Sequence, residues 1–163
     1  VFRRIPGQFI TKMQKGGSKD FGFCKITMVH ADHPSTCVGP QGIQITGGDA
    51  VGFIIQIPHL NTTFYHMGDT NVFGDMQLIN DLYKPNIAFV PVGDCLGMGP
   101  REAAYALKKF LPDVKQVIPM HFGTFPVLTG TPELLGEAFK EWGVEDKEII
   151  HPKKFLGGAA FLN

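Results

Sequence analysis

Residues 51–70 have the sequence Val-Gly-Phe-Ile-Ile-Gln-Ile-Pro-His-Leu-Asn-Thr-Thr-Phe-Tyr-His-Met-Gly-Asp-Thr, and this stretch decides the fold. The apolar run 51–57 is typical of a strand that is covered on both faces. Pro58 begins a turn, and residues 63–67 are predicted to form the antiparallel partner strand. The polar residues 68–70 follow where that strand ends. A rigid sheet can hold a metal ligand at such a point and still leave the metal open to substrate.

Two further runs place a histidine just after a strand-like segment. Residues 29–33 are Val-His-Ala-Asp-His, and residues 118–126 are Ile-Pro-Met-His-Phe-Gly-Thr-Phe-Pro. We therefore expect His33, Asp69 and His121 to meet at one edge of a sheet as metal ligands, because imidazole nitrogen and carboxylate oxygen suit a borderline cation. Local features leave alternatives open. Asp69 also suits a turn or a helix cap, and His121 suits a buried, hydrogen-bonded position.

The remaining periodicity predicts one mixed α/β domain over residues 1–163. Apolar, β-branched runs predict strands, and apolar residues at helical spacing predict helices. Thr131 is the predicted cap of the last helix and Gly143 its end. After Asp69 the order helix, strand, helix, strand, helix, strand is that of a layered α/β protein. The predicted strands are 9–13, 23–29, 51–57, 63–67, 87–92, 114–119 and 148–150, and the predicted helices are 73–83, 100–111 and 131–142.

Composition limits the classes of function. Fifteen basic residues balance fifteen acidic ones, and no basic block stands out, so a nucleic-acid partner is not expected. No apolar run approaches the ~20 residues of a transmembrane helix, so no membrane partner is expected either. Three cysteines without a Cys-x-x-Cys motif favour a reducing cytoplasm over a disulfide framework.

Several other residues are candidates for supporting roles. A metal-bound imidazole needs an outer partner that fixes its tautomer, and Asp32 and Asp75 are suited to it, as are backbone carbonyls. His66 lies within a predicted strand and points away from the face of Asp69, which favours an outer or structural role. Thr124 belongs to a loop that either lines a pocket or is a tight connection. The glycine-rich residues 93–100 precede a helix and either cradle an anion or allow a close backbone approach.

Together the quoted runs, with Met13-Gln14-Lys15-Gly16-Gly17, Phe73-Gly74-Asp75-Met76 and Met98-Gly99-Pro100-Arg101-Glu102, resemble the metallo-β-lactamase superfamily. The resemblance is closer to its branch of uncharacterised metal-dependent hydrolases related to the L-ascorbate-6-phosphate lactonases. It implies a four-layer αββα sandwich with two divalent cations, zinc or manganese. It also implies that Asp69 bridges the two ions and is catalytic, that His33 and His121 each hold one, and that metal-activated water attacks an ester, lactone or phosphoester.

The sequence departs from that family in one respect, because the motif His-x-His-x-Asp-His occurs nowhere in it. We expect the chain to be the C-terminal portion of one such domain, with a small-molecule substrate and either a missing N-terminal segment or self-association. The alternative is a non-catalytic remnant or an assembly module. A nucleic-acid phosphodiesterase of the same fold is disfavoured by the balanced charge.

Overall fold

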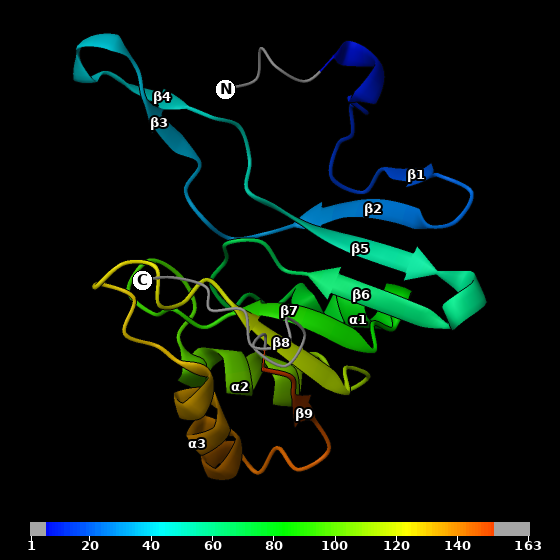
Figure 1. The fold of residues 1–163 in the computed structure, drawn as a ribbon, viewed down its shortest axis with the longest axis vertical. Coiled ribbons are helices and arrows are strands. Elements are labelled where there is room, and N and C mark those ends of the chain that lie inside the picture. Colours follow the sequence, from blue (N-terminus) through cyan, green and yellow to red (C-terminus); the bar gives the residue numbers. More distant parts are fainter. Residues whose placement is uncertain (1–5, 152–163) are drawn as a thin grey trace.

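The computed structural model describes residues 6–151, and its centre is a seven-stranded sheet in the order β1-β2-β5-β6-β7-β8-β9 (Figure 1). Strands β1, β2, β5 and β6 pair antiparallel, and β6, β7, β8 and β9 pair parallel. The strands are β1 Ser18–Asp20, β2 Lys25–His30, β5 Val51–Ile57, β6 Thr62–His66, β7 Ile87–Pro91, β8 Gln116–Met120 and β9 Glu148–Ile149.

Helices connect the parallel strands, as the change of period after Asp69 predicts. They are α1 Met76–Tyr83, α2 Pro100–Lys109 and α3 Pro132–Trp142. The Thr131 side chain accepts a hydrogen bond from the Leu134 amide, and Gly143 ends α3 in the left-handed conformation, so both predicted ends are confirmed. Short 3₁₀ turns occur at Gly7–Phe9 (η2), Pro40–Gly42 (η3) and Pro58–Leu60 (η4). None of the described helices has the length and apolarity needed to span a membrane.

The predicted strand over residues 9–13 is wrong. Only the turn η2 forms there, and residues 10–13 are irregular. The strand next to β2 is instead β1, after Gly16 and Gly17 have already bonded to the backbone of Met28. An apolar run becomes a strand only where a neighbouring strand takes its backbone hydrogen bonds, and no described strand pairs with residues 9–13.

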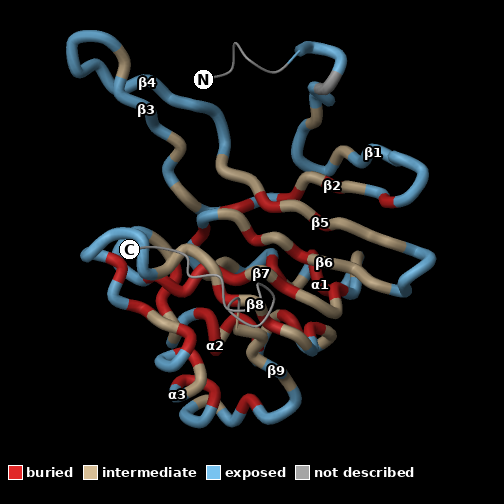
Figure 2. Tube along the Cα trace, viewed as in Figure 1, coloured by how far each residue is buried: buried red, intermediate tan, exposed pale blue. Residues whose placement is uncertain are grey.

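The three helices cover one face of the sheet and bury its central row of side chains completely. Side chains on that face alternate along the strands, so that Ile54, Tyr65, Ala88 and Val117 form one row in register across β5 to β8. This row joins a core cluster that includes Leu107 of α2 and further residues of all three helices. Figure 2 shows the buried positions concentrated on these strands and helices.

The opposite face of the sheet is apolar but has no second layer among the described residues. Its large apolar side chains are half-buried, whereas the helix-covered row is fully buried. Two rows in register make up this face: Met28, Phe53, His66, Phe89 and Ile118 form one, and Ile26, Ile55, Phe64 and Ile87 form the other. We define the open face by the eight large apolar residues of these rows: Ile26, Met28, Phe53, Ile55, Phe64, Ile87, Phe89 and Ile118. The expectation that residues 51–57 are covered on both faces is therefore met on one face only within residues 6–151.

A second, two-stranded sheet stands apart from the first. Strands β3 (Thr36–Val38) and β4 (Gln44–Thr46) pair antiparallel in the segment between β2 and β5, where the sequence pattern indicated only a loop. This hairpin, which we call the arm, projects away from the main sheet (Figure 1).

Candidate metal centre

Asp69 lies beyond the carboxyl end of β6, at the point where the chain leaves the sheet. Met67 is fully buried and still donates its amide to Phe89 of the next strand. Gly68 then turns the chain with a φ of 71°, and its amide donates to Nδ1 of His66 at 3.2 Å. Thr70, the residue after Asp69, is buried and fixed in place, because its hydroxyl oxygen accepts a hydrogen bond of 2.9 Å from the Asp32 amide. The Asp69 carboxylate between these anchors remains 52% exposed.

Gly68 is the residue that allows this turn. A side chain there would adopt an unfavourable left-handed conformation, and its Cβ would collide with the carbonyl oxygen of Val51. We therefore expect Gly68→Ala to lower the free energy of unfolding by about 1–3 kcal/mol. Gly74→Ala is the matched control, because Gly74 has no positive φ and a Cβ added there would meet no atom within 4 Å. Urea denaturation of both variants measures the difference, and equal stabilities would contradict this account of the turn.

His121 occupies the corresponding place after β8, on a backbone with a φ of 54°. Its Nε2 lies 3.7 Å from Oδ1 of Asp69, and its side chain is 29% exposed. Gly93, after β7, makes this approach possible, because a Cβ there would collide with the His121 carbonyl oxygen. Ligand bonds to zinc are roughly 2.0–2.2 Å long, so one ion between these two atoms is compatible with their separation.

His33 lines a cavity that Asp69 and His121 also border, but both nitrogens of its ring face backbone carbonyl oxygens. Nδ1 lies 2.7 Å from the Pro34 carbonyl oxygen, and Nε2 lies 2.9 Å from the Leu96 carbonyl oxygen. A ring nitrogen that faces a carbonyl oxygen offers no lone pair to a metal, so His33 must give up one of these contacts to become a ligand. Across residues 6–151, no three His, Cys, Asp or Glu side chains converge as a group that could hold a metal ion.

The three predicted ligands nevertheless border one cavity of about 480 Å³ at the carboxyl ends of the strands. The donor types fit a divalent cation, because a carboxylate oxygen and an imidazole nitrogen lie 3.7 Å apart, close enough for one ion to bind both. The convergence of His33, Asp69 and His121 on one ion stays a prediction. The cavity is lined by Asp32, His33, Pro34, Asp69, Asn71, Cys95, Leu96, Gly97 and His121.

The four residues predicted to support the ligands occupy different places. Asp32 lines the cavity, and its backbone bonds to Thr70 and Asn71, the two residues that follow Asp69. His66 stacks on Phe89 with 5.5 Å between ring centroids and supports the Gly68 turn from the open face. Asp75 is exposed at the start of α1, and Thr124 is exposed in the loop after His121. Neither of these two lines the cavity.

Sequence reasoning did not assign five wall residues to this site: Pro34, Asn71, Cys95, Leu96 and Gly97. Asn71 follows Gly68-Asp69-Thr70 directly, so its place after the strand end was an available signal. Leu96 comes from the glycine-rich loop, and it reaches the cavity only because that loop folds back towards His33. Nothing in the local sequence indicates that contact.

The glycine-rich loop does not provide an anion cradle. A Cβ at Gly99 would lie 2.9 Å from Oε2 of Glu102 and 3.3 Å from Oδ1 of Asp94, so two carboxylates already occupy the surroundings of the α2 N-terminus. The positive end of the helix dipole is thereby satisfied by the protein's own acidic groups. The loop is a close backbone approach, which is the second of the two sequence interpretations.

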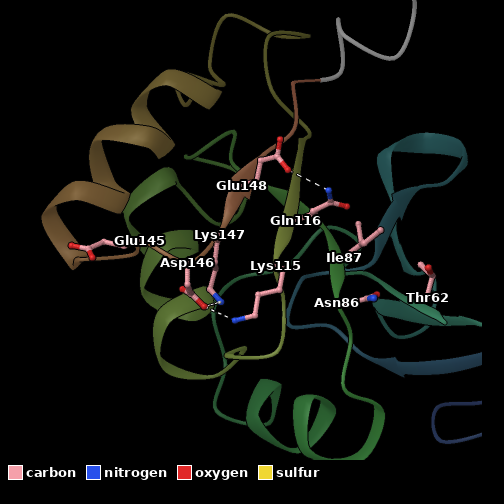
Figure 3. Close-up of a pocket in the computed structure, with 9 residues that line it drawn as sticks. All are labelled: Thr62, Asn86, Ile87, Lys115, Gln116, Glu145, Asp146, Lys147 and Glu148. Atoms are coloured by element: carbon pink, nitrogen blue, oxygen red, sulfur yellow. Dashed lines mark hydrogen bonds and ion pairs between the residues drawn. The ribbon is translucent and has the colours of Figure 1, made fainter. Parts of the chain in front are cut away.

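A larger cavity of about 650 Å³ lies at the amino ends of the same parallel strands (Figure 3). Its charged side chains satisfy one another. Lys115 bonds to Asp146 at 2.6 Å and holds the pKa of that carboxyl below its usual value. Lys147 donates to the carbonyls of Leu111, Pro112 and Val114, and burial lowers its pKa. These bonds tie the segment before β9 to the connection between α2 and β8. We assign the chemistry to the smaller cavity.

The family of this chain is shown by known proteins that resemble it. A family model described as β-lactamase superfamily domain matches residues 2–122. A UPF0173 metal-dependent hydrolase of Koribacter versatilis is 47% identical over 133 residues, which are 81% of this chain and 54% of that protein. A second, from Methanosarcina barkeri, is 43% identical over 147 residues, or 90% of this chain and 61% of that protein. The chain thus spans little more than half the length of these curated relatives.

Solved structures show the same fold. Igni18, a metallo hydrolase from Ignicoccus hospitalis, superposes with a TM-score of 0.68 at 26% identity and covers 87% of this chain and 57% of its own. A putative zinc-dependent hydrolase of the metallo-β-lactamase superfamily from Thermotoga maritima has a TM-score of 0.58 at 18% identity, with 85% and 70% covered, and supports the fold alone. The narrower relation to L-ascorbate-6-phosphate lactonases stays a prediction. The mixed α/β fold, the family model and the sequence relatives together place this chain in the metallo-β-lactamase superfamily.

Proposed function

We propose that this chain supplies one part of the active site of a metal-dependent hydrolase that uses metal-activated water on an ester, lactone or phosphoester of a small molecule. The observation that carries the proposal is the 3.7 Å approach of the Asp69 carboxylate and the His121 imidazole at the mouth of one cavity. The relatives named metal-dependent hydrolases support the same reaction class.

The residues of this chain have separate tasks in that proposal. Asp69 and His121 hold the cation or cations, zinc or manganese, and His33 joins them after its ring leaves the Leu96 carbonyl. When bound, such a metal lowers the pKa of its water towards neutrality and polarises the substrate's electrophilic centre. Asp69 is the residue that we place between two ions. Asn71 and Leu96 form the wall against which the substrate lies.

The second candidate function is a non-catalytic assembly module. It is favoured by one observation, namely that the described residues contain no group of three converging ligands. Two candidate ligands in reach of one ion bind a metal weakly, because an open catalytic zinc site normally has three protein ligands. The two candidates therefore differ in what happens when the rest of a family domain is supplied.

The experiment compares this chain with a chimera that joins it to the upstream half of the Koribacter versatilis relative. Metal content after incubation with Zn²⁺ or Mn²⁺ is measured by atomic emission, and hydrolysis is measured with p-nitrophenyl acetate, a γ-lactone and bis-p-nitrophenyl phosphate. We expect tight metal binding and chelator-sensitive turnover only in the chimera. A folded chimera that binds no metal, or that binds metal and hydrolyses none of these classes, favours the assembly module.

A further inference from the structure

The arm is exposed on both of its faces. Its two strands pair in the register Thr36 with Thr46, Cys37 with Ile45 and Val38 with Gln44, and every residue of both strands is exposed. Figure 2 shows the exposed colour along most of the hairpin. Val38 on one face is 73% exposed, and Ile45 on the other face is 48% exposed. An isolated two-stranded hairpin is marginally stable in water, so this element needs a covering partner.

Charge separates the arm from the other free strand edges of the described chain. Residues 34–48 contain no charged side chain. The outer strands of the main sheet are protected, because β1 carries Lys19 and Asp20 and β9 carries Glu148. Charged residues on an edge strand oppose pairing with another chain, and a long uncharged edge permits it. The arm can therefore meet an identical arm without like-charge repulsion.

The backbone of β3 is also self-complementary. Hydrogen bonds join Gly39 to Ile43 and Gly47 to Ser35, and bonded pairs alternate along an antiparallel ladder. Cys37 and Ile45 lie midway between these two bonded pairs and therefore form a bonded pair as well. The N–H and C=O groups of Cys37 thus point towards β4, inside the hairpin. Thr36 and Val38 direct theirs to the free edge. If two copies pair about a two-fold axis at Cys37, each Thr36 faces the other copy's Val38. The N–H and C=O groups of Thr36 and Val38, four in each copy, are then all hydrogen-bonded.

From this register and charge pattern we propose that the arm binds the same arm of a second copy of this chain, with β3 antiparallel to β3 and the two-fold axis at Cys37. In this arrangement the two Cys37 residues form a non-hydrogen-bonded pair, with Cα atoms about 4.5 Å apart. That spacing is within the range that a disulfide spans. The arm follows His33 and Pro34 directly, so pairing also fixes the segment that borders the candidate metal cavity.

Oxidative cross-linking tests the register. In a Cys95→Ser background Cys37 is the exposed thiol of the described chain, because Cys24 is buried. The comparison protein carries Cys37→Ser, Cys95→Ser and Leu82→Cys. It moves the thiol to α1, to a position that is also exposed, because Leu82 is 72% exposed. Copper phenanthroline is added to each protein, and dimers are quantified on non-reducing gels. We expect the Cys37 dimer to form at least tenfold faster than the comparison dimer.

A second pair of variants separates arm pairing from association through any other surface. Val38→Lys puts a charge on the pairing edge and is expected to slow Cys37 cross-linking at least tenfold, whereas Leu82→Lys leaves it unchanged. Circular dichroism checks that both variants keep their helices. Equal cross-linking rates for the two thiol positions, or no effect of Val38→Lys, would overturn the proposal. So would protection of Cys37 from a maleimide in a protein that forms no Cys37 dimer, because a different occupant would then cover the arm.

Discussion

Asp69→Asn is expected to lower hydrolysis by the chimera with the Koribacter versatilis half at least about a hundredfold, and to reduce its bound metal. Changes to groups that only orient a metal ligand already cost roughly 10–100-fold in affinity or activity, so loss of the carboxylate that we propose as a metal ligand should cost more. The amide keeps the size of the side chain but removes its negative charge. Steady-state rates and metal content of the purified proteins provide the measurement.

Asp81→Asn is the matched control for this result. Asp81 is an exposed carboxylate on α1 that accepts a hydrogen bond from Gln77, and it lies outside the candidate cavity. The same charge is removed there, so a change that acts only through net charge would affect both variants equally. An Asp69→Asn chimera that keeps its metal and its rate would show that Asp69 is a turn residue and no ligand.

The 163-residue chain alone is expected to associate or aggregate through the open face. Ile55, Phe64, Phe89 and Ile118 stand side by side there without a covering layer among the described residues. Each 100 Å² of apolar surface left in water costs about 2.5 kcal/mol, and a single domain has only about 5–15 kcal/mol of net stability. Light scattering and binding of an apolar dye measure this property directly.

Two substitutions locate the surface that is responsible. Phe89→Glu combined with Ile55→Lys places opposite charges in adjacent rows of the open face and is expected to raise the monomeric fraction severalfold, with dye fluorescence reduced. Leu78→Lys is the control, because Leu78 is a 57% exposed leucine of α1, on the helix side of the sheet. A monodisperse 17.9 kDa species that binds no dye before any substitution would contradict the prediction. In the chimera, where the upstream half supplies a second layer, dye binding should fall in the unsubstituted protein.

The amino-acid pattern predicted the order of elements from β5 to β9 and the places of two candidate ligands. The apolar run of β5 and the change to helical spacing after Asp69 depend on local backbone geometry, so the one-dimensional pattern reports them directly. Asp69 follows β6 and His121 follows β8, and these two strands lie on either side of β7 in the parallel part of the sheet. Parallel strands bring their carboxyl ends to one edge. Their approach to 3.7 Å therefore follows the pattern that the sequence predicted.

Only the tertiary structure decided the state of His33, the open face and the arm. The His33 ring meets the carbonyl of Leu96 across 63 residues of chain, and no local period encodes such a contact. An apolar strand has the same sequence whether one or both of its faces are covered. Residues 51–57 therefore could not reveal that no layer within residues 6–151 covers Phe53 and Ile55. The arm lacks a clear alternation of apolar and polar residues, and it was recognisable as a hairpin only through its backbone hydrogen bonds. Periodicity records how a segment folds locally, whereas these three features depend on which distant group, if any, lies against it.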